Sequence, residues 1–226
     1  MTISVCISHI YPERRKNFDR LVPALLGSTR PPNEIIVWNN DSPDFNPPGC
    51  QMIHATPNPG PGARFLAALC ARSDYIFFQG TDLMVQPETL DYLCGWLEKA
   101  PTSTFGFEGR VLTAGHPYAY AMHHGLDGKD LTTAVPNHIS MGRMDIITRD
   151  VLLNVLPDVP LFERHDDIWF SAALVKHHVG RFVVPYTPGI NGFTDLPEGG
   201  VGICRHPTHL SVRDDLCKQL FPVERG

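Results

Sequence analysis

Short apolar runs alternate along the chain with segments of helical periodicity. The runs at residues 2–7, 34–38 and 75–78 are rich in β-branched or aromatic residues and have the length of buried strands. After the first run, apolar residues recur from Phe18 at i, i+3, i+4 and i+7, and Gly27 follows them as a stop signal. Strands that alternate with helices predict an α/β fold with a central, mostly parallel sheet flanked by helices.

The remaining elements follow from the same patterns. Residues 111–136 show no clear period and are expected to form a long irregular segment. Asp166 or Asp167 is expected to cap a helix that stops at Gly180. Further strands are expected at 51–54, 104–108, 139–141 and 181–185, and further helices at 65–72, from Pro87 through Leu97, and at 150–156.

Composition indicates one globular unit. The chain has 226 residues, and its hydrophobic content of 42% is enough for a large core. The formal net charge of -5 provides no general attraction to nucleic acid or to an anionic membrane. We therefore expect a single domain that covers residues 1–226.

Cysteine spacing and hydropathy predict an intracellular protein. The six cysteines are far apart and include no CxxC pair, which is typical of a reducing compartment rather than of a disulfide scaffold or a zinc ribbon. No stretch reaches the roughly 18 apolar residues that a membrane-spanning helix needs. The start of the chain shows no secretory signal pattern. The expected location is the cytoplasm, without membrane attachment.

Candidate ligand-binding side chains lie where predicted strands end. Asp82 and the run Asn39, Asn40 and Asp41 each follow a predicted strand. Open α/β sheets bind ligands at the carboxyl ends of their strands, so these turns are expected to face one site.

Three further segments carry polar side chains at positions that favour ligand binding or catalysis. Glycines ahead of the helix at 65–72 allow the backbone to approach an anion, which makes Asn58, Gly60 and Arg64 candidates. The adjacent carboxylates of Asp166 and Asp167 are more than a helix cap requires. The tail is glycine-rich at first and then carries two arginines and two histidines, which suits a flexible lid over a phosphate or a metal. These four are Arg205, His206, His209 and Arg213.

Together these features resemble the inverting family 2 glycosyltransferases of the GT-A fold, which use nucleotide-sugars. The resemblance covers residues 3–184 and rests on four motifs in order. Residues 35–42 resemble the strand and polar turn that hold the nucleoside, and 58–64 resemble the helix entry beside the base and diphosphate. Residues 75–90 resemble the segment with the metal-binding Asp-x-Asp, and 165–171 resemble the motif that opens the acceptor-side helix.

The resemblance implies a division of labour along the chain. Residues 1–100 are expected to form the half that binds the nucleotide-sugar, 101–195 the acceptor-side half, and 196–226 a C-terminal lid. A UDP-sugar is the expected donor. The implied donor-binding residues are His9, Asn39, Asn40, Asp41, Asn58, Gly60, Arg64, Thr81, Asp82 and Arg205.

The resemblance also implies a divalent cation, Mn²⁺ or Mg²⁺. Its candidate ligands are Asp82, His206 and His209. Where the family has its first metal-site aspartate, however, this chain has Gly80. Because one carboxylate is a poor site for a hard cation, weak or absent metal dependence is the alternative.

The implied mechanism is a single displacement at the anomeric carbon of the sugar. Asp167, or its neighbour Asp166, takes the proton of the acceptor hydroxyl as general base. Asp82 with its metal, together with Arg64, Arg205 and His206, neutralises the departing diphosphate.

Two other classes compete with this interpretation. A nucleotidyltransferase of related fold opens with a glycine-rich loop after its first strand, and residues 8–16 contain no glycine. A non-catalytic module that binds a nucleotide-sugar or a glycan is favoured by Gly80. It is disfavoured by the doubled carboxylate of Asp166 and Asp167, and turnover of a nucleotide-sugar separates the two.

The sequence leaves the acceptor open among small molecules, glycans, proteins and nucleic acids. Stand-alone enzymes that resemble this chain include phage enzymes that glucosylate hydroxymethylated DNA bases, in which case the location is the host cytoplasm. From Ser140 onward nine Lys or Arg side chains stand against eleven Asp or Glu, so no basic half indicates DNA binding. The rings at residues 116–124 either line an acceptor groove or belong to a surface loop.

Overall fold

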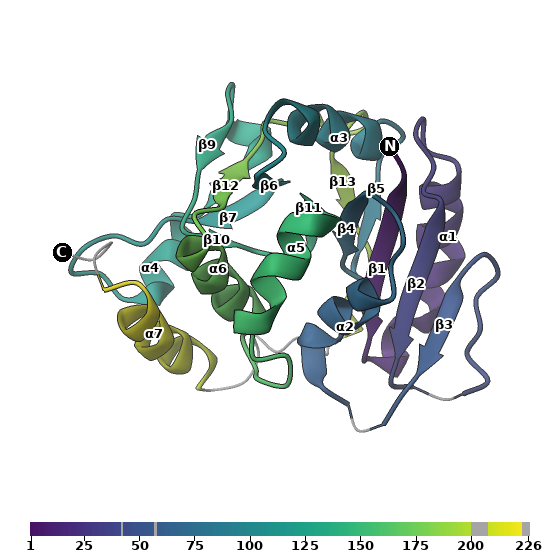
Figure 1. Ribbon diagram of the computed structural model, residues 1–226, viewed down its shortest axis with the longest axis horizontal. Helices are drawn as coiled ribbons and strands as arrows, with labels where there is room; N and C mark the ends of the chain where they lie inside the picture. Colours follow the sequence, from purple (N-terminus) through teal and green to yellow (C-terminus); the bar gives the residue numbers. More distant parts are fainter. Residues whose placement is uncertain (42, 57, 200–207, 223–226) are drawn as a thin grey trace.

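The computed structural model describes residues 1–41, 43–56, 58–199 and 208–222. Within them, a central eight-stranded sheet has the order β3-β2-β1-β4-β11-β6-β12-β9 (Figure 1). β3, β2, β1 and β4 run parallel, β11 is antiparallel to both of its neighbours, and β12 is parallel to β6. The strands are β1 (Ile3–His9), β2 (Glu34–Asn39), β3 (Gln51–His54), β4 (Tyr75–Gln79), β6 (Ser103–Gly106), β9 (Val135–Pro136), β11 (Met144–Thr148) and β12 (Gly180–Val183).

Helices cover both faces of this sheet because its strands are apolar on both sides. In β4, Phe77 packs into one core, whereas Ile76 and Phe78 pack into the other. The first core is completed by α1 (Phe18–Leu26) and α3 (Thr89–Lys99), and the second by α2 (Ala63–Leu69), α5 (Arg149–Val155) and α6 (Asp166–Lys176) (Figure 1).

Smaller elements close the fold at the carboxyl end of the sheet. A third apolar cluster joins α4 (Tyr118–His123) and α7 (His209–Leu220) to α6. Two further sheets pair β10 (Ile139–Ser140), β7 (Glu108–Arg110) and β8 (Leu126–Asp127), and β13 (Phe193–Asp195) with β5 (Leu83–Val85). Short 3₁₀ turns lie at η1 (Pro12–Asn17), η2 (Gly60–Gly62), η3 (Gly128–Asp130) and η4 (Leu156–Asp158).

The structure confirms the predicted α/β class and corrects several elements. The expected strand at 104–108 is divided between β6 and β7 at Phe107. The segment at 111–136 is not wholly irregular, because it contains α4, η3 and parts of two sheets. Neither Asp166 nor Asp167 caps α6: the N-cap is His165, at φ 64, and both carboxylates lie in the first turn. The helix expected to stop at Gly180 ends at Lys176.

β11 is the central strand that the apolar pattern did not predict. It carries Asp145 in its interior, where the side chain is 2% exposed. Gly106 lies opposite in the register, and a Cβ at that position would lie 1.8 Å from Asp145 Oδ1. The N–H of Gly142 donates to Asp145 Oδ2 at 2.8 Å. A glycine distant in sequence therefore makes the space that allows a carboxyl group inside the sheet.

Asp145 should make stability depend on pH. Burial raises its pKa to about 7, and the N–H of Gly142 and the charge of Arg64 oppose this shift without cancelling it. Between about pH 4 and pH 7 the native state then binds more protons than the unfolded chain. The free energy of unfolding should fall as pH rises through this window, by roughly 4 kcal/mol in total.

The substitution Asp145→Asn should remove this dependence, because the amide has nearly the same shape and does not ionise. Urea unfolding at pH 4.5 and pH 8 measures the difference. We expect the variant to be more stable than the unsubstituted chain at pH 8 and similar to it at pH 4.5. Parallel pH profiles for the two proteins would contradict the assignment.

Among the described residues, no helix combines the length and the apolar character needed to cross a bilayer.

Candidate functional site

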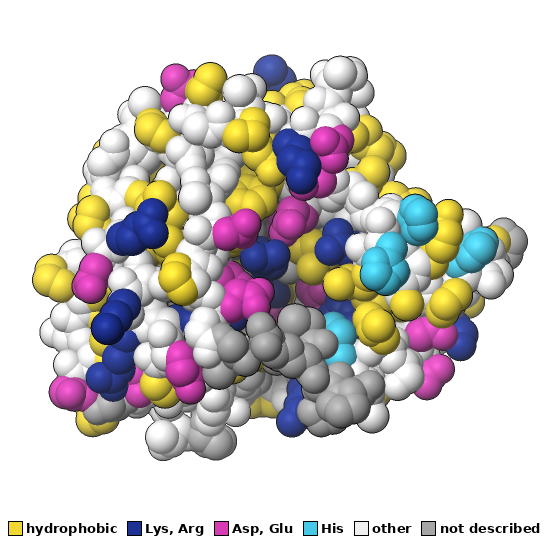
Figure 2. Space-filling view, turned by 180° about the vertical axis from the view of Figure 1, so that it is seen from behind, with side chains coloured by type: hydrophobic (Ala, Val, Ile, Leu, Met, Phe, Trp, Pro, Cys, Tyr) yellow, Lys and Arg dark blue, Asp and Glu magenta, His cyan; other side chains and the backbone are white. Residues whose placement is uncertain are grey.

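A cavity of about 290 Å³ opens at the carboxyl ends of β1 and β4. Acidic and basic side chains gather in a hollow on this face (Figure 2). Because parallel strands β1 and β4 are neighbours, the turns that follow them meet there. The cavity is lined by Ser8, Ile10, Tyr11, Arg14, Pro61, Arg64, Gly80, Thr81, Asp82, Arg110, Tyr118, Met122, Met141, Arg143, His165, Asp166, Asp167, Glu198, His209 and Arg213.

The cavity brings together about half of the residues that the sequence indicated. Those that line it are Arg64, Thr81, Asp82, Asp166, Asp167, His209 and Arg213. Those that do not line it are His9, Asn39, Asn40, Asp41, Asn58 and Gly60. Arg205 and His206 lie outside the described residues, as does Ser42 of the polar turn.

His9 and Asp41 form a neighbouring polar cluster at the ends of β1 and β2. His9 Nε2 lies 3.3 Å from Asp41 Oδ2, and Arg15 Nε donates to the same carboxylate oxygen. The amide of Asn39 lies 3.0 Å from the ring nitrogen of His54. Burial lowers the pKa of His9 although Asp41 opposes the effect. These groups are engaged with one another beside the cavity rather than inside it.

The glycine-rich entry to α2 directs Arg64 into the cavity. Gly60 adopts φ +79 and donates its N–H to Asn58 Oδ1 at 2.8 Å, which turns the chain into η2. Gly62 passes so close to Leu161 that an added Cβ would lie 2.7 Å from its carbonyl oxygen. The side chain of Arg64 then extends to Gly142 and Asp166, and the residue is 8% exposed.

Asp82 lies between two arginines. Arg14 Nη1 is 3.3 Å and Arg143 Nη2 is 3.6 Å from Asp82 Oδ2. Arg143 also pairs with Glu108, with Nη1 3.2 Å from Oε2. The carboxylate of Asp82 is therefore already neutralised by protein cations.

This arrangement does not fit a divalent cation held by Asp82. The described residues contain no group of three or more His, Cys, Asp or Glu side chains placed to hold a metal ion. His209 lines the same cavity, whereas His206 lies outside the described ranges. A hard cation requires several oxygen ligands and is repelled by adjacent guanidinium groups.

Asp166 and Asp167 each form a buried ion pair, but their oxygens are used differently. Arg64 donates to Oδ2 of Asp166 through Nη2 and to the carbonyl of Gly142 through Nη1. Arg213 donates to both oxygens of Asp167, at 2.9 Å and 2.5 Å. Within the described residues no group donates to Oδ1 of Asp166, and this side chain lines the cavity.

The two carboxylates also differ in proton affinity. Burial raises the pKa of Asp166, and the charge of Asp167 adds to this effect against the opposing charge of Arg64. Burial acts on Asp167 as well, but Arg213 outweighs it and lowers the pKa of that carboxyl. Asp166 is the stronger base of the pair.

His165 is held as a neutral ring. Burial and the charge of Arg213 lower the pKa of His165 to about 4. Arg213 Nη1 lies 3.5 Å from His165 Nδ1, which places an acceptor at that nitrogen and the ring proton at Nε2. The ring centroids of His165 and His209 are 5.3 Å apart.

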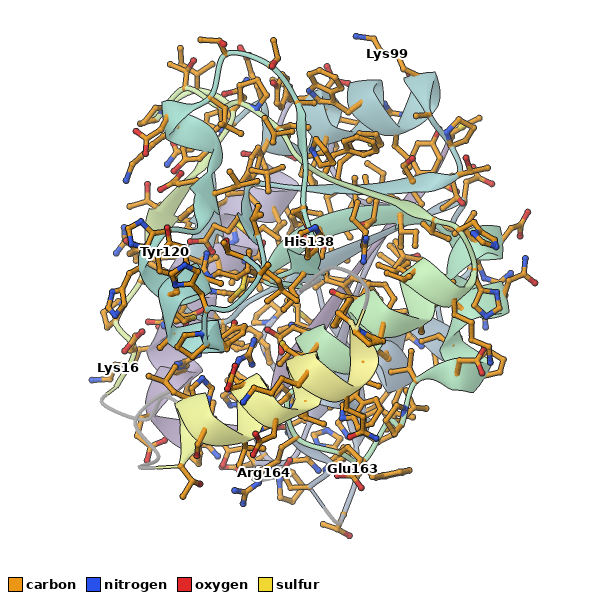
Figure 3. The ribbon with its side chains drawn as sticks, turned by 90° about the vertical axis from the view of Figure 1, so that its left-hand side faces the viewer. Lys16, Lys99, Tyr120, His138, Glu163 and Arg164 are labelled. Carbon is orange, nitrogen blue, oxygen red and sulfur yellow. The ribbon has the colours of Figure 1, made fainter. Side chains whose placement is uncertain are left out.

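A second cavity of about 440 Å³ lies between the start of α6 and α7. His165 and His209 line both cavities, so these two rings form part of the wall between them. Glu163 and Arg164 lie near α7 at the entrance to this second space (Figure 3). Its other lining residues are Phe162, Trp169, Thr208, Val212 and Leu216.

The rings at residues 116–124 lie in and beside α4, and some of them are buried whereas others are exposed. Tyr118 is fully buried, and its hydroxyl accepts a hydrogen bond from Arg213 Nη2 at 2.6 Å. His116 and His124 are exposed and stack on Tyr120 at centroid distances of 4.3 Å and 4.1 Å. Histidines gather on this projecting flank beside the hollow (Figure 2).

Sequence reasoning missed three arginines that line the cavity. Arg14 belongs to the run Glu-Arg-Arg-Lys after the first strand, and this basic run at a strand end was a usable signal. Arg110 is the last residue of β7, and Arg143 directly precedes β11. The apolar pattern did not give the bounds of these two strands. Glu198 also lines the cavity and was not singled out. Tyr118 lines it too, and it is one of the rings at residues 116–124 for which an acceptor groove and a surface loop were both left open.

Comparison with known proteins identifies the fold. No protein-family model matches the chain, and no curated protein matches it by sequence. Residues 1–349 of S. aureus TarS, a glycosyltransferase, match with a TM-score of 0.58 and 14% sequence identity. The match covers 87% of this chain and 60% of that structure. At this identity the likeness shows the fold, a GT-A-like α/β arrangement around a mostly parallel sheet.

Proposed function

We propose that this chain is a glycosyltransferase that moves a sugar from a nucleotide-sugar to an acceptor hydroxyl, with inversion at the anomeric carbon. The observation that carries the proposal is one cavity in which Asp166 keeps a carboxylate oxygen available opposite a group of arginines. A base and an anion-binding surface in one hollow are what displacement of a nucleoside diphosphate requires. The likeness to a glycosyltransferase structure supports this class of reaction.

Asp166 is the better candidate for the general base. A base needs a free lone pair within reach of the acceptor hydroxyl and a proton affinity above that of an ordinary carboxylate. Asp166 has an oxygen without a donor among the described residues and a raised pKa, whereas both oxygens of Asp167 accept hydrogen bonds from Arg213 and its pKa is lowered. The role of Asp167 is then to fix Arg213, and through it α7, against the start of α6.

Two groups of residues orient the donor, one for its nucleoside and one for its diphosphate. The polar turn after β2 and the His9–Asp41 cluster lie beside the cavity and are the candidate surface for the nucleoside. The arginines at the ends of β1 and β4 receive the diphosphate, and the sugar then lies toward Asp166. A UDP-sugar is the proposed donor.

The same geometry disfavours both a nucleotidyltransferase and a non-catalytic binding module. A nucleotidyltransferase attacks an α-phosphate and has no use for a carboxylate base positioned for a sugar acceptor. A binding module has no need for the Asp166 oxygen that lacks a donor, since a buried polar atom without a hydrogen bond costs stability. Release of nucleoside diphosphate, rather than pyrophosphate, separates the first alternative from glycosyl transfer.

Thermal unfolding of the purified chain with a panel of nucleoside diphosphates and nucleotide-sugars tests the donor site. A ligand at 100 times its dissociation constant should raise the free energy of unfolding by about 2.7 kcal/mol. We expect one nucleotide to stabilise the chain well above the others. Equal and negligible shifts with every member of the panel would count against a nucleotide-sugar site.

A further inference from the structure

The cavity at the carboxyl ends of β1 and β4 is lined by more arginines than carboxylates. Five arginines line it, and within the described residues its lining carboxylates are Asp82, Asp166, Asp167 and Glu198. Asp166 and Asp167 take one arginine each, Arg64 and Arg213. Arg14 and Arg143 flank Asp82, which follows β4, and Arg110 lines the same cavity.

Arg110 has no ionic partner in the described part of the chain. Its Nη1 donates to the carbonyl oxygen of Gly109 at 2.9 Å, and its buried Nε has no hydrogen-bond partner there. A guanidinium group that lines a cavity without a carboxylate is a ready site for an anion, because its donors stay charged at every physiological pH.

Gly80 is part of the same arrangement. Its N–H donates to the carbonyl of Arg143 at 2.6 Å, which holds the Arg143 loop against the turn of Asp82. A Cβ at Gly80 would lie 2.9 Å from Asp82 Oδ1 and 3.4 Å from the carbonyl of Arg143. A side chain at this position would disturb the contact that places Arg143 beside Asp82. Gly80, which stands where the family has its first metal-site aspartate, and Arg143 thus belong to one local structure.

We propose that Arg14, Arg110 and Arg143 bind the diphosphate of the donor directly and do so without a divalent cation. This proposal rests on the proposed function and specifies how its anionic donor is held. The planar forks of guanidinium groups match phosphate oxygens with paired, charge-assisted hydrogen bonds. In the absence of donor, Asp82 occupies Arg14 and Arg143, and the diphosphate takes over these donors when it binds.

Titration of inorganic pyrophosphate into the purified full chain, followed by calorimetry in EDTA, tests this directly. Pyrophosphate reports on the anion site without requiring the identity of the nucleoside. We expect saturable binding in EDTA. Excess Mn²⁺ should weaken it, because the ion withdraws pyrophosphate from solution. Binding that requires Mn²⁺, or becomes tighter with it, would overturn the proposal.

Two substitutions sharpen the test. Arg143→Gln should weaken pyrophosphate binding by about tenfold or more, since a charge-assisted contact is lost. Arg30→Gln is the matched control, because Arg30 also pairs with two carboxylates, Asp91 and Glu98, on a surface away from the cavity. Equal affinities for the Arg143 variant and this control would overturn the proposal.

Asp82→Asn gives an outcome of opposite sign and does not depend on the folding of the Arg143 variant. If Asp82 competes with the anion for Arg14 and Arg143, its replacement should tighten pyrophosphate binding in EDTA. If Asp82 holds a metal, the replacement should abolish Mn²⁺-supported binding and leave no binding in EDTA. Weaker or unchanged affinity in EDTA contradicts the proposal.

The failure of this inference is distinguishable from failure of the proposed function. Turnover of a nucleotide-sugar that requires Mn²⁺ would overturn the metal-free site and leave glycosyl transfer standing. Binding of pyrophosphate in EDTA by a chain that turns over no nucleotide-sugar would support the arginine site and count against the proposed function.

Discussion

Replacement of Asp166 by asparagine is expected to lower kcat for sugar transfer by roughly 10²- to 10⁴-fold, the usual contribution of a positioned general base. Asparagine keeps an oxygen that accepts the hydrogen bond from Arg64, so donor binding and folding should change little. The measurement is the steady-state rate of nucleoside diphosphate release, together with the thermal midpoint of the variant.

Asp167→Asn is the matched control for this substitution because the two carboxylates are adjacent and equally buried. Its expected effect is mainly on stability, since Asp167 accepts both hydrogen bonds of Arg213. A base with a raised pKa also predicts that kcat rises with pH as Asp166 loses its proton. Loss of turnover in the Asp167 variant, with normal turnover in the Asp166 variant, would reverse the assignment.

Replacement of Arg213 by methionine should lower the free energy of unfolding by about 3–5 kcal/mol, because it leaves Asp167 as a buried charge without its partner. The same change removes the donor to Tyr118 and one of the links that join α7 to the site. Urea unfolding measures the loss. A cost below about 1 kcal/mol would show that the pair behaves like an exposed one.

A double substitution separates burial of charge from loss of packing. Asp167→Leu combined with Arg213→Met removes both charges and should recover most of the stability lost in the single variant. Because the folded pKa of Asp167 is lowered, the stability from this pair should be present above the ordinary aspartate pKa and be lost as pH falls through the folded value. The double variant should lack this acid dependence.

Local pattern predicted those parts of the fold that are set by local contacts. β1, β2 and β4 are apolar on both faces, and α1 carries its apolar residues at helical spacing, so each is visible in a short window. β11 is different, because Asp145 breaks the apolar run and the glycine that accommodates it, Gly106, is far away in the sequence. α7 was not predicted either, because most of its residues are polar and its buried Arg213 is held by a partner distant in sequence.

In the candidate site too, some residues were predictable from local sequence patterns and others depended on contacts between distant segments. Asp82 and Arg64 lie at a strand end and a helix entry, which are positions that sequence patterns mark. The pairing of Arg213 with Asp167 joins residues 46 positions apart and has no signature in either segment. Arg143 could be placed only once β11 was known. The carboxylates of the cavity and Arg64 were therefore predictable, whereas the contacts of Arg143 and Arg213 with Asp82 and Asp167 required the fold.

The most direct test of nucleotide-sugar-dependent transfer is product analysis. The chain is incubated with the nucleotide-sugar that stabilises it and with water or a hydroxyl acceptor, and the products are followed by chromatography and proton NMR. The proposed function predicts nucleoside diphosphate and a sugar product of inverted anomeric configuration, both formed at least about 10²-fold more slowly by the Asp166→Asn variant. Intact donor, or release of nucleoside monophosphate and sugar 1-phosphate, would contradict it.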